Sequence, residues 1–218
     1  MTKNRKIAVI LSGCGVYDGA EIHESVFTLW AIEKAGAKAS IFAPDVDQHH
    51  VINHITGQPT SETRNVLIES ARIARGNISP ISKLMVADFD ALVFPGGFGV
   101  AKNLCSFAFD GPNCKVLPEI EQLIKNFHQQ NKPIGALCIS PALITKVLGK
   151  TEVTIGNDAG TAKAIEVMGG THKTTTHGEI VIDKVNKLVT TPCYMLDATM
   201  GQIASGADNL IDAIIHLI

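Results

Sequence analysis

The sequence predicts an α/β protein: a three-layer sandwich in which a mostly parallel central sheet is covered by helices on both faces. Short, continuously apolar runs alternate with segments of helical periodicity, the pattern of parallel strands buried on both sides. The chain has 218 residues, of which 45% are hydrophobic, enough to bury one sizeable core. We therefore expect a single domain over residues 1–218, with an insertion at about residues 45–84.

The expected elements follow one another as strands and helices, and glycine or proline marks several of their ends. Gly36 stops the first helix, Pro44 closes the second strand, and Pro95 follows the third strand. The expected strands are 7–11, 38–43, 91–94, 133–137, 180–182 and 188–190, and the expected helices are 24–35, 117–130, 140–148, 161–168 and 197–217.

Two segments do not fit this alternation. Residues 45–84 contain polar and turn-forming residues and a helical run over 63–74, which we interpret as an excursion packed over the strand ends. Residues 105–115, which include Phe107 and Phe109, could form a lid or an interface loop.

Charge and cysteine content restrict the class of partner and the compartment. A formal net charge of −2 gives no basic surface for nucleic acid or an anionic membrane. Five irregularly spaced cysteines indicate reduced thiols rather than a disulfide framework. Residues 11–14 look like a lipoprotein cleavage box, but the apolar run before them is shorter than the roughly 7–15 residues of a signal peptide. We expect a cytoplasmic protein.

The segment Pro133–Ile144 contains the best candidate nucleophile. A short apolar strand ends at Cys138, and small residues with Pro141 then open a helix, as in the turn that presents the serine of G-x-S-x-G hydrolases. A helix N-terminus aimed at the sulfur would lower the pKa of the Cys138 thiol. The alternative is that Cys138 is a small buried hydrophobic residue.

Acidic residues follow the first strand, at a point where they could reach this thiol. In parallel sheets ligands bind beyond the carboxyl ends of the strands, so the loop after the first strand, the Pro95-Gly96-Gly97 turn and Cys138 should converge. Glu21 and Glu24 lie three residues apart and can share one helical face. A carboxyl group beside a thiol can transfer a proton and tune the nucleophile. The alternative is an acidic first turn that complements the helix dipole.

Two weaker signals accompany this pair. The adjacent Gly96 and Gly97 could turn backbone N–H groups toward a ligand as an oxyanion hole, although a plain tight turn explains the same residues. His49, His50 and His54 would face a metal only on a helix, which the nearby glycine and proline disfavour. No metal site is therefore expected.

The order strand–GAExxE–strand–PGG–strand–CxxP resembles the PfpI/ThiJ superfamily, which has the class I glutamine amidotransferase-like fold. Within it, LSGCGVYDGAEIHES, INHITGQ, ETRNVLIE, FPGGFGVAKNL, CISPAL, TIGND and TTPCYML are similar to the ElbB family of enhancing-lycopene-biosynthesis, or isoprenoid-biosynthesis glyoxalase, proteins, related to mitochondrial ES-one-type proteins. The resemblance covers nearly the whole chain. It implies a flavodoxin-like sandwich with Cys138 on a nucleophile elbow, Glu24 touching the thiol, and an oxyanion hole at the N–H groups of Gly97 and Ile139.

The chain departs from active relatives in one respect. Those relatives carry a histidine after the cysteine, where this chain has Ile139, or on the next strand, where it reads Val153–Asp158 without one. Amidotransferases also have a distant His-x-Glu, which the segment TTPCYMLD lacks. Glutamine hydrolysis and peptidase activity are therefore not expected. The resemblance implies instead a slow, cofactor-independent glyoxalase that converts glyoxal to glycolate. A non-catalytic stress-response or redox-sensing protein that uses the same cysteine is the alternative.

The remaining expectations concern the pocket and the partners. The further pocket candidates are Gly13, Cys14, Glu21, Gly96, Asn157 and Asp158. We expect a small dicarbonyl substrate, no cofactor, no nucleic-acid or membrane partner, and a homodimer.

Overall fold

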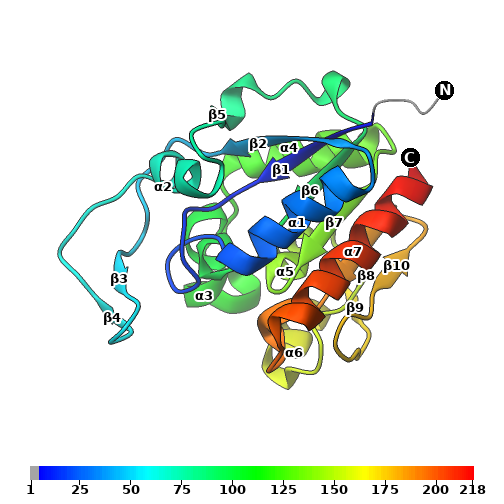
Figure 1. Cartoon of the computed structure of the whole chain (residues 1–218). Coiled ribbons are helices and arrows are strands. Elements are labelled where there is room, and N and C mark those ends of the chain that lie inside the picture. Colours follow the sequence, from blue (N-terminus) through cyan, green and yellow to red (C-terminus); the bar gives the residue numbers. More distant parts are fainter. Residues whose placement is uncertain (1–4) are drawn as a thin grey trace.

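The computed structural model describes residues 5–218, and its centre is a seven-stranded sheet (Figure 1). From one edge to the other the strands are β10 (Val181–Asp183), β11 (Leu188–Thr191), β7 (Ile134–Leu137), β6 (Ala91–Phe94), β1 (Lys6–Ile10), β2 (Lys38–Ala43) and β5 (Ser79–Pro80). All neighbouring strands of this sheet run parallel except β10 and β11, which are antiparallel. The predicted α/β sandwich with a mostly parallel sheet is confirmed.

Helices cover both faces of this sheet. The helices are α1 (Ile22–Lys34), α2 (Val66–Ile73), α3 (Phe107–Asp110), α4 (Pro118–Gln129), α5 (Ser140–Leu148), α6 (Ala159–Val167) and α7 (Met200–Leu217). Figure 1 shows α1 and α7 side by side on one face, with α4 behind the sheet. No helix within residues 5–218 has the length and apolar character needed to span a bilayer.

The strand sequences explain the two cores. Side chains alternate between the faces of a strand, so a strand that is apolar at every position contributes to both. In β1, Ile7 and Val9 join the core beneath α1 and α7, whereas Ala8 and Ile10 join the core beneath α4 and α5. A parallel sheet buried in this way follows directly from the continuous apolar runs in the sequence.

Capping residues set the helix boundaries, and they account for most differences from the predicted ranges. α1 begins at Ile22 rather than residue 24 because the Glu21 carboxylate accepts a hydrogen bond from the Glu24 N–H at 2.7 Å. α2 begins at Val66 rather than residue 63 because Asn65 is its N-cap. α6 begins at Ala159 rather than 161 after an Asp158 cap, and α7 at Met200 rather than 197 after a Thr199 capping box.

The inserted segment, residues 45–84, both extends the central sheet and forms a hairpin outside it. Its last piece, β5, pairs with β2 and extends the central sheet, which the sequence did not predict. Its hairpin, β3 (Ile52–Asn53) and β4 (Gln58–Pro59), projects from the body at the left of Figure 1. The helix α2 packs near the carboxyl end of β1, since Ser70 Oγ accepts a hydrogen bond from the Gly13 N–H at 2.9 Å.

Two further features lie outside the predicted elements. A separate parallel pair, β8 (Glu152–Val153) and β9 (Thr171–His172), forms beside β10. The segment predicted as an irregular loop contains α3, preceded by a π-helical turn over Val100–Leu104.

Candidate active site

The cysteine elbow lies at the carboxyl end of β7, where the chain turns into α5. Cys138 has a φ of 59°, a left-handed conformation that costs energy for any residue other than glycine and is found at functional turns. Two hydrogen bonds hold the turn, from the Cys138 N–H to Thr191 O at 2.9 Å and from Ser140 Oγ to Pro95 O at 2.9 Å. The strained backbone is thus anchored to both neighbouring strands.

Glu24 lies against this thiol. Its carboxyl group is fully buried and is hydrogen-bonded to the Cys138 side chain. Backbone donors fix both of its oxygens: Gly96 N–H donates to Oε2 at 2.9 Å and Tyr194 N–H donates to Oε1 at 3.2 Å. The carboxyl group is therefore held in one orientation by segments that follow β6 and β11.

Gly96 makes this contact possible. A Cβ atom at position 96 would lie 2.3 Å from Cys138 Cβ, 2.6 Å from Glu24 Oε2 and 2.9 Å from Cys138 Sγ. No side chain fits there. Glycine is therefore needed at position 96 because Cys138 and Glu24 pack directly against its backbone, and not because the turn must be flexible. Gly97 follows with a φ of 99°, and its N–H group, like that of Ile139, contacts the Cys138 sulfur. The loop after β1 is tied to this turn by the Glu21 N–H, which donates to Gly96 O at 2.9 Å.

The electrostatics of the pair differ from the sequence expectation in one respect. Burial, reinforced by the neighbouring Glu21, raises the pKa of Glu24 to about 8. Burial also raises the pKa of the Cys138 thiol well above its ordinary value, and the charge of Glu24 adds to the effect. The predicted low pKa at Cys138 is therefore wrong, because desolvation outweighs the backbone N–H groups that favour the thiolate. Glu24 loses its proton before the thiol does.

A cavity of about 430 Å³ opens onto the thiol. Its wall is mainly apolar, and Asp158 supplies the only carboxyl group among the residues that form it. These residues are Val16, Gly97, Phe98, Ala101, Phe107, Ala108, Cys138, Ile139, Asp158, Thr161, Tyr194 and Met195. The segment expected to form a lid, residues 105–115, thus contributes Phe107 and Ala108 to the cavity wall.

Several predicted pocket residues lie elsewhere. Gly13 packs against Gly19 and Gln48, and the half-buried Cys14 lies near the carboxylate of Glu69. These two residues, Glu21 and Asn157 are not part of the cavity wall. Gly96 is not part of the wall either, although it contacts Cys138 and Glu24.

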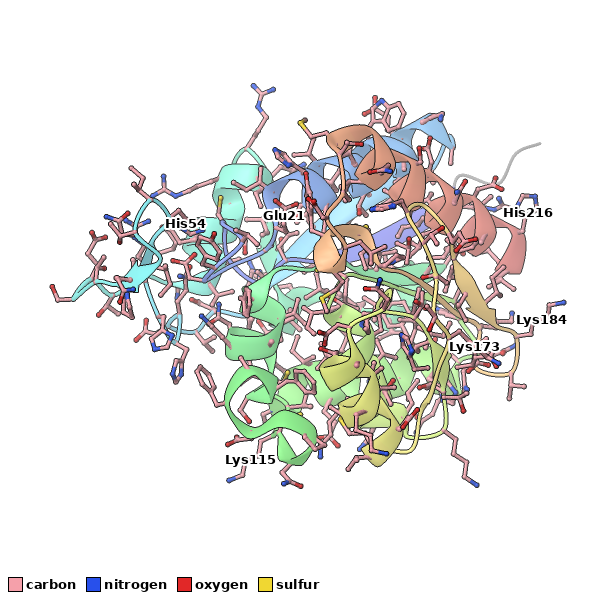
Figure 2. The ribbon with its side chains drawn as sticks, turned by 90° about the horizontal axis from the view of Figure 1, so that it is seen from below. Glu21, His54, Lys115, Lys173, Lys184 and His216 are labelled. Atoms are coloured by element: carbon pink, nitrogen blue, oxygen red, sulfur yellow. The ribbon has the colours of Figure 1, made fainter. Side chains whose placement is uncertain are left out.

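The Glu21 side chain caps α1 instead of lining the cavity. Figure 2 shows Glu21 at the start of that helix, whereas His54 lies out on the inserted segment.

The histidines considered for a metal do not share a helix. His49 packs on Phe109 with ring centroids 4.2 Å apart, and His50 contacts the same ring edge-on at 5.8 Å. His54 packs on Tyr17 at 4.9 Å. Tyr194 is the main site residue that sequence reasoning missed. It follows the last central strand, β11, in the TTPCYML segment, and that position after a parallel strand could have identified it.

Comparison with known proteins gives close relatives, although no protein-family model matches the chain. The chain is 48% identical over 222 residues to glutamine amidotransferase-like class 1 domain-containing protein 3, mitochondrial, of Homo sapiens, covering 97% of this chain and 83% of the relative. It is 46% identical to the ES1 protein homolog, mitochondrial, of Rattus norvegicus, over 97% of this chain and 84% of that protein.

Solved structures agree with these relatives. The crystal structure of an isoprenoid biosynthesis protein with an amidotransferase-like domain from Ehrlichia chaffeensis superposes with a TM-score of 0.92. It has 38% sequence identity, over 98% of this chain and 99% of that chain. Glyoxalase III from Candida albicans shares the fold at 15% identity, with a TM-score of 0.63 over 96% of this chain and 97% of its own.

These relatives contradict the predicted cytoplasmic location, because both sequence relatives are mitochondrial proteins. The prediction was based on unpaired cysteines and a short apolar run. Unpaired cysteines indicate that the thiols are reduced, and they do not separate one reducing compartment from another.

The elbow cysteine, the buried glutamate and the full-length similarity lead to one assignment. The chain belongs to the class I glutamine amidotransferase-like, DJ-1/PfpI superfamily, and within it is ElbB-like and ES1-like.

Proposed function

We propose that the protein is a slow, cofactor-independent glyoxalase that converts glyoxal and water to glycolate. The observation that carries the proposal is the buried Glu24 carboxyl group, hydrogen-bonded to the Cys138 thiol where a cavity of about 430 Å³ begins. A nucleophile, a base in contact with it, and a cavity for a small molecule are the parts that covalent catalysis on a carbonyl requires. The glyoxalase III members of the superfamily support the choice of reaction.

The first step is addition of the thiol to one aldehyde carbon, C1. The Glu24 carboxylate accepts the S–H proton as the S–C1 bond forms, and the C1 oxygen becomes an alkoxide. The N–H groups of Gly97 and Ile139 already contact the sulfur, and they are the nearest donors to the developing oxyanion. The alkoxide then takes the proton back from Glu24, which leaves a neutral hemithioacetal and a carboxylate.

The second step moves a hydrogen from C1 to C2. The Glu24 carboxylate removes the C1 proton, the electron pair forms a C1=C2 bond, and the C2 carbonyl oxygen is protonated. Glu24 returns its proton to C2 while the hydroxyl on C1 loses its own, which gives a glycolyl thioester on Cys138. Water then cleaves the S–C1 bond, releasing glycolate and restoring the thiol.

The raised pKa of Glu24 suits this role. A general base works best when its pKa is close to the working pH, and about 8 meets that condition where an ordinary glutamate would be too weak a base. One general acid–base group contributes roughly 10²–10⁴-fold to a rate, so a cavity wall without an imidazole is consistent with slow turnover.

The alternative, a non-catalytic redox sensor, is less well supported. Sensor cysteines are accessible and have a low pKa, because the thiolate is the form that oxidants attack. Cys138 is only 7% exposed, and the pKa of its thiol is raised.

Glycolate formation from glyoxal, followed by proton NMR with metal-free protein, tests the proposal. The wild-type protein should produce glycolate, and Cys138→Ala should reduce the rate to that of the buffer. Cys14→Ala is the matched control, since Cys14 lies outside the cavity wall, and it should keep full activity. Glycolate formation that survives in Cys138→Ala, or that is absent from the wild type, contradicts the proposal.

A further inference from the structure

Tyr194 and His23 form a hydrogen-bonded pair beside the candidate active site. The Tyr194 hydroxyl lies 2.8 Å from His23 Nδ1, and the two ring centroids are 5.9 Å apart. His23 is on the first turn of α1, whereas Tyr194 lies in the 3-10 turn Cys193–Met195 after β11. The contact therefore joins two segments that are distant in sequence at the carboxyl ends of the strands.

The same tyrosine touches the site in two other ways. Tyr194 belongs to the wall of the Cys138 cavity, and its backbone N–H donates to Glu24 Oε1 at 3.2 Å. Tyr194 is thus in direct contact with the proposed base and also lines the space that a substrate would fill.

The surroundings keep the hydroxyl protonated. Burial and the nearby Glu21, Glu24 and Cys193 all raise the pKa of Tyr194 above its ordinary value. A phenol in this state is a hydrogen-bond and proton donor at neutral pH. The reaction needs such a donor, because the C2 oxygen gains a proton when Glu24 removes the hydrogen from C1.

We propose that the Tyr194 hydroxyl is a catalytic group that protonates the C2 oxygen of the substrate, and that His23 is a positioning residue that restores its proton. This inference rests on the proposed glyoxalase function and supplies the acid that its second step lacks. As the C1–H bond breaks, the C2=O π electrons move to oxygen, which takes the Tyr194 proton. His23 then gives its Nδ1 proton to the tyrosinate and takes one from solvent at Nε2, and proton exchange with solvent returns the ring to its Nδ1–H form before the next turnover.

The exposure of His23 fits this relay. Its side chain is 44% exposed, so solvent can reach the ring, while Nδ1 faces the tyrosine and lies 3.9 Å from Glu21 Oε1. When the thioester forms, the C1 hydroxyl releases its proton to solvent. The step therefore takes one proton from solvent through His23 and returns one.

Tyr194→Phe tests the hydroxyl alone, since the ring and the backbone N–H to Glu24 remain. We expect kcat for glyoxal to fall about 10²-fold, the lower end of the range for a general acid, with KM changed less than about threefold. The rate of Cys138 alkylation by iodoacetamide should not change, because the hydroxyl acts on the substrate and not on the thiol. Tyr17→Phe is the matched control. Tyr17 also packs on a histidine, at 4.9 Å, but outside the cavity wall, and its replacement should be neutral.

Variants of His23 distinguish a role in proton transfer from a purely structural role. His23→Leu should lower kcat about tenfold, and His23→Asn, which keeps a polar group near Nδ1, should recover part of that loss. An unchanged kcat in Tyr194→Phe overturns the inference even though glycolate still forms. A fall in Cys138 alkylation equal to the fall in kcat overturns it too, since Tyr194 would then act through the thiol.

A second measurement keeps the inference testable if glyoxal is not turned over. 2,3-Butanedione can add to Cys138 but has no aldehyde hydrogen to move, so the adduct accumulates and its equilibrium constant can be measured by mass spectrometry. Loss of one hydrogen bond to the second carbonyl in Tyr194→Phe should weaken the adduct about three- to tenfold. An equally stable adduct in Tyr194→Phe, or no adduct in the wild type, overturns the inference.

Discussion

The Glu24 carboxyl group and the Cys138 thiol are hydrogen-bonded to each other above the same glycine, with no room between them for a methyl group on Gly96. Burial raises the pKa of both groups, and the carboxyl group is the first of the two to ionise. The pair is therefore arranged for a base that takes a proton from sulfur, rather than for a thiolate that is present at rest.

Gly96→Ala should disable the site by steric conflict. The new Cβ would lie 2.3 Å from Cys138 Cβ, so the elbow must move, at a cost of about 1–3 kcal/mol in the free energy of unfolding. Glycolate formation should fall at least about tenfold. Gly160→Ala, on α6 with its nearest neighbour at 3.5 Å, is the control and should be neutral or slightly stabilising in urea unfolding. Normal activity in Gly96→Ala would show that the tight contact is not needed.

Glu24→Gln should remove the base while keeping the shape of the side chain. We expect glycolate formation to fall about 10²–10⁴-fold. Alkylation of Cys138 at pH 8.5 should become faster than in the wild type, because the carboxylate charge no longer raises the pKa of the thiol. Wild-type turnover in Glu24→Gln would mean that Glu24 is not the base and only stabilises the first turn of α1.

Activity should rise with pH as Glu24 ionises. The carboxylate is the active form, so kcat/KM is expected to increase about tenfold per unit below pH 7 and to level off above a pKa of about 8. The profile is measured with glyoxal between pH 6 and 9, and the slope should disappear from the residual activity of Glu24→Gln. A flat profile, or one that falls over this range, would mean that protonated Glu24 is the active form.

Stability should fall over the same range. A carboxyl group whose pKa is higher in the folded state than in the unfolded state binds its proton more tightly when folded. Raising the pH from about 4.5 toward 8 therefore favours unfolding. Between pH 6 and 8 the wild type should lose about 2 kcal/mol relative to Glu24→Gln in urea titrations. Parallel losses in the two proteins would show that Glu24 is already ionised at pH 6.

Much of this architecture could be predicted from residue patterns. The apolar run before Cys138 and the proline after it predicted the elbow, and the convergence of strand ends predicted that Glu24 and Gly96 would lie near the sulfur. The resemblance to a known family implied the same residues for the site. The roles of Glu24 and Cys138 in a reaction remain predictions.

What could not be predicted depends on burial and on long-range contacts. The sequence shows the helix N-terminus beside Cys138 but not the degree of desolvation, which reverses the direction of the thiol pKa shift. The Tyr194–His23 contact joins positions 171 residues apart, and no local pattern indicates it. β5 was missed because two residues, one of them a proline, form a strand only when β2 lies beside them.

The most direct test of the proposed mechanism is to trap the covalent intermediate. Protein mixed with glyoxal, quenched within one turnover and digested, should carry a mass equal to one glyoxal on the peptide that contains Cys138. The mechanism predicts that this adduct appears before glycolate, decays as glycolate forms, and is missing from Cys138→Ala but present in Cys14→Ala. Glycolate formed without any adduct on Cys138 would contradict it.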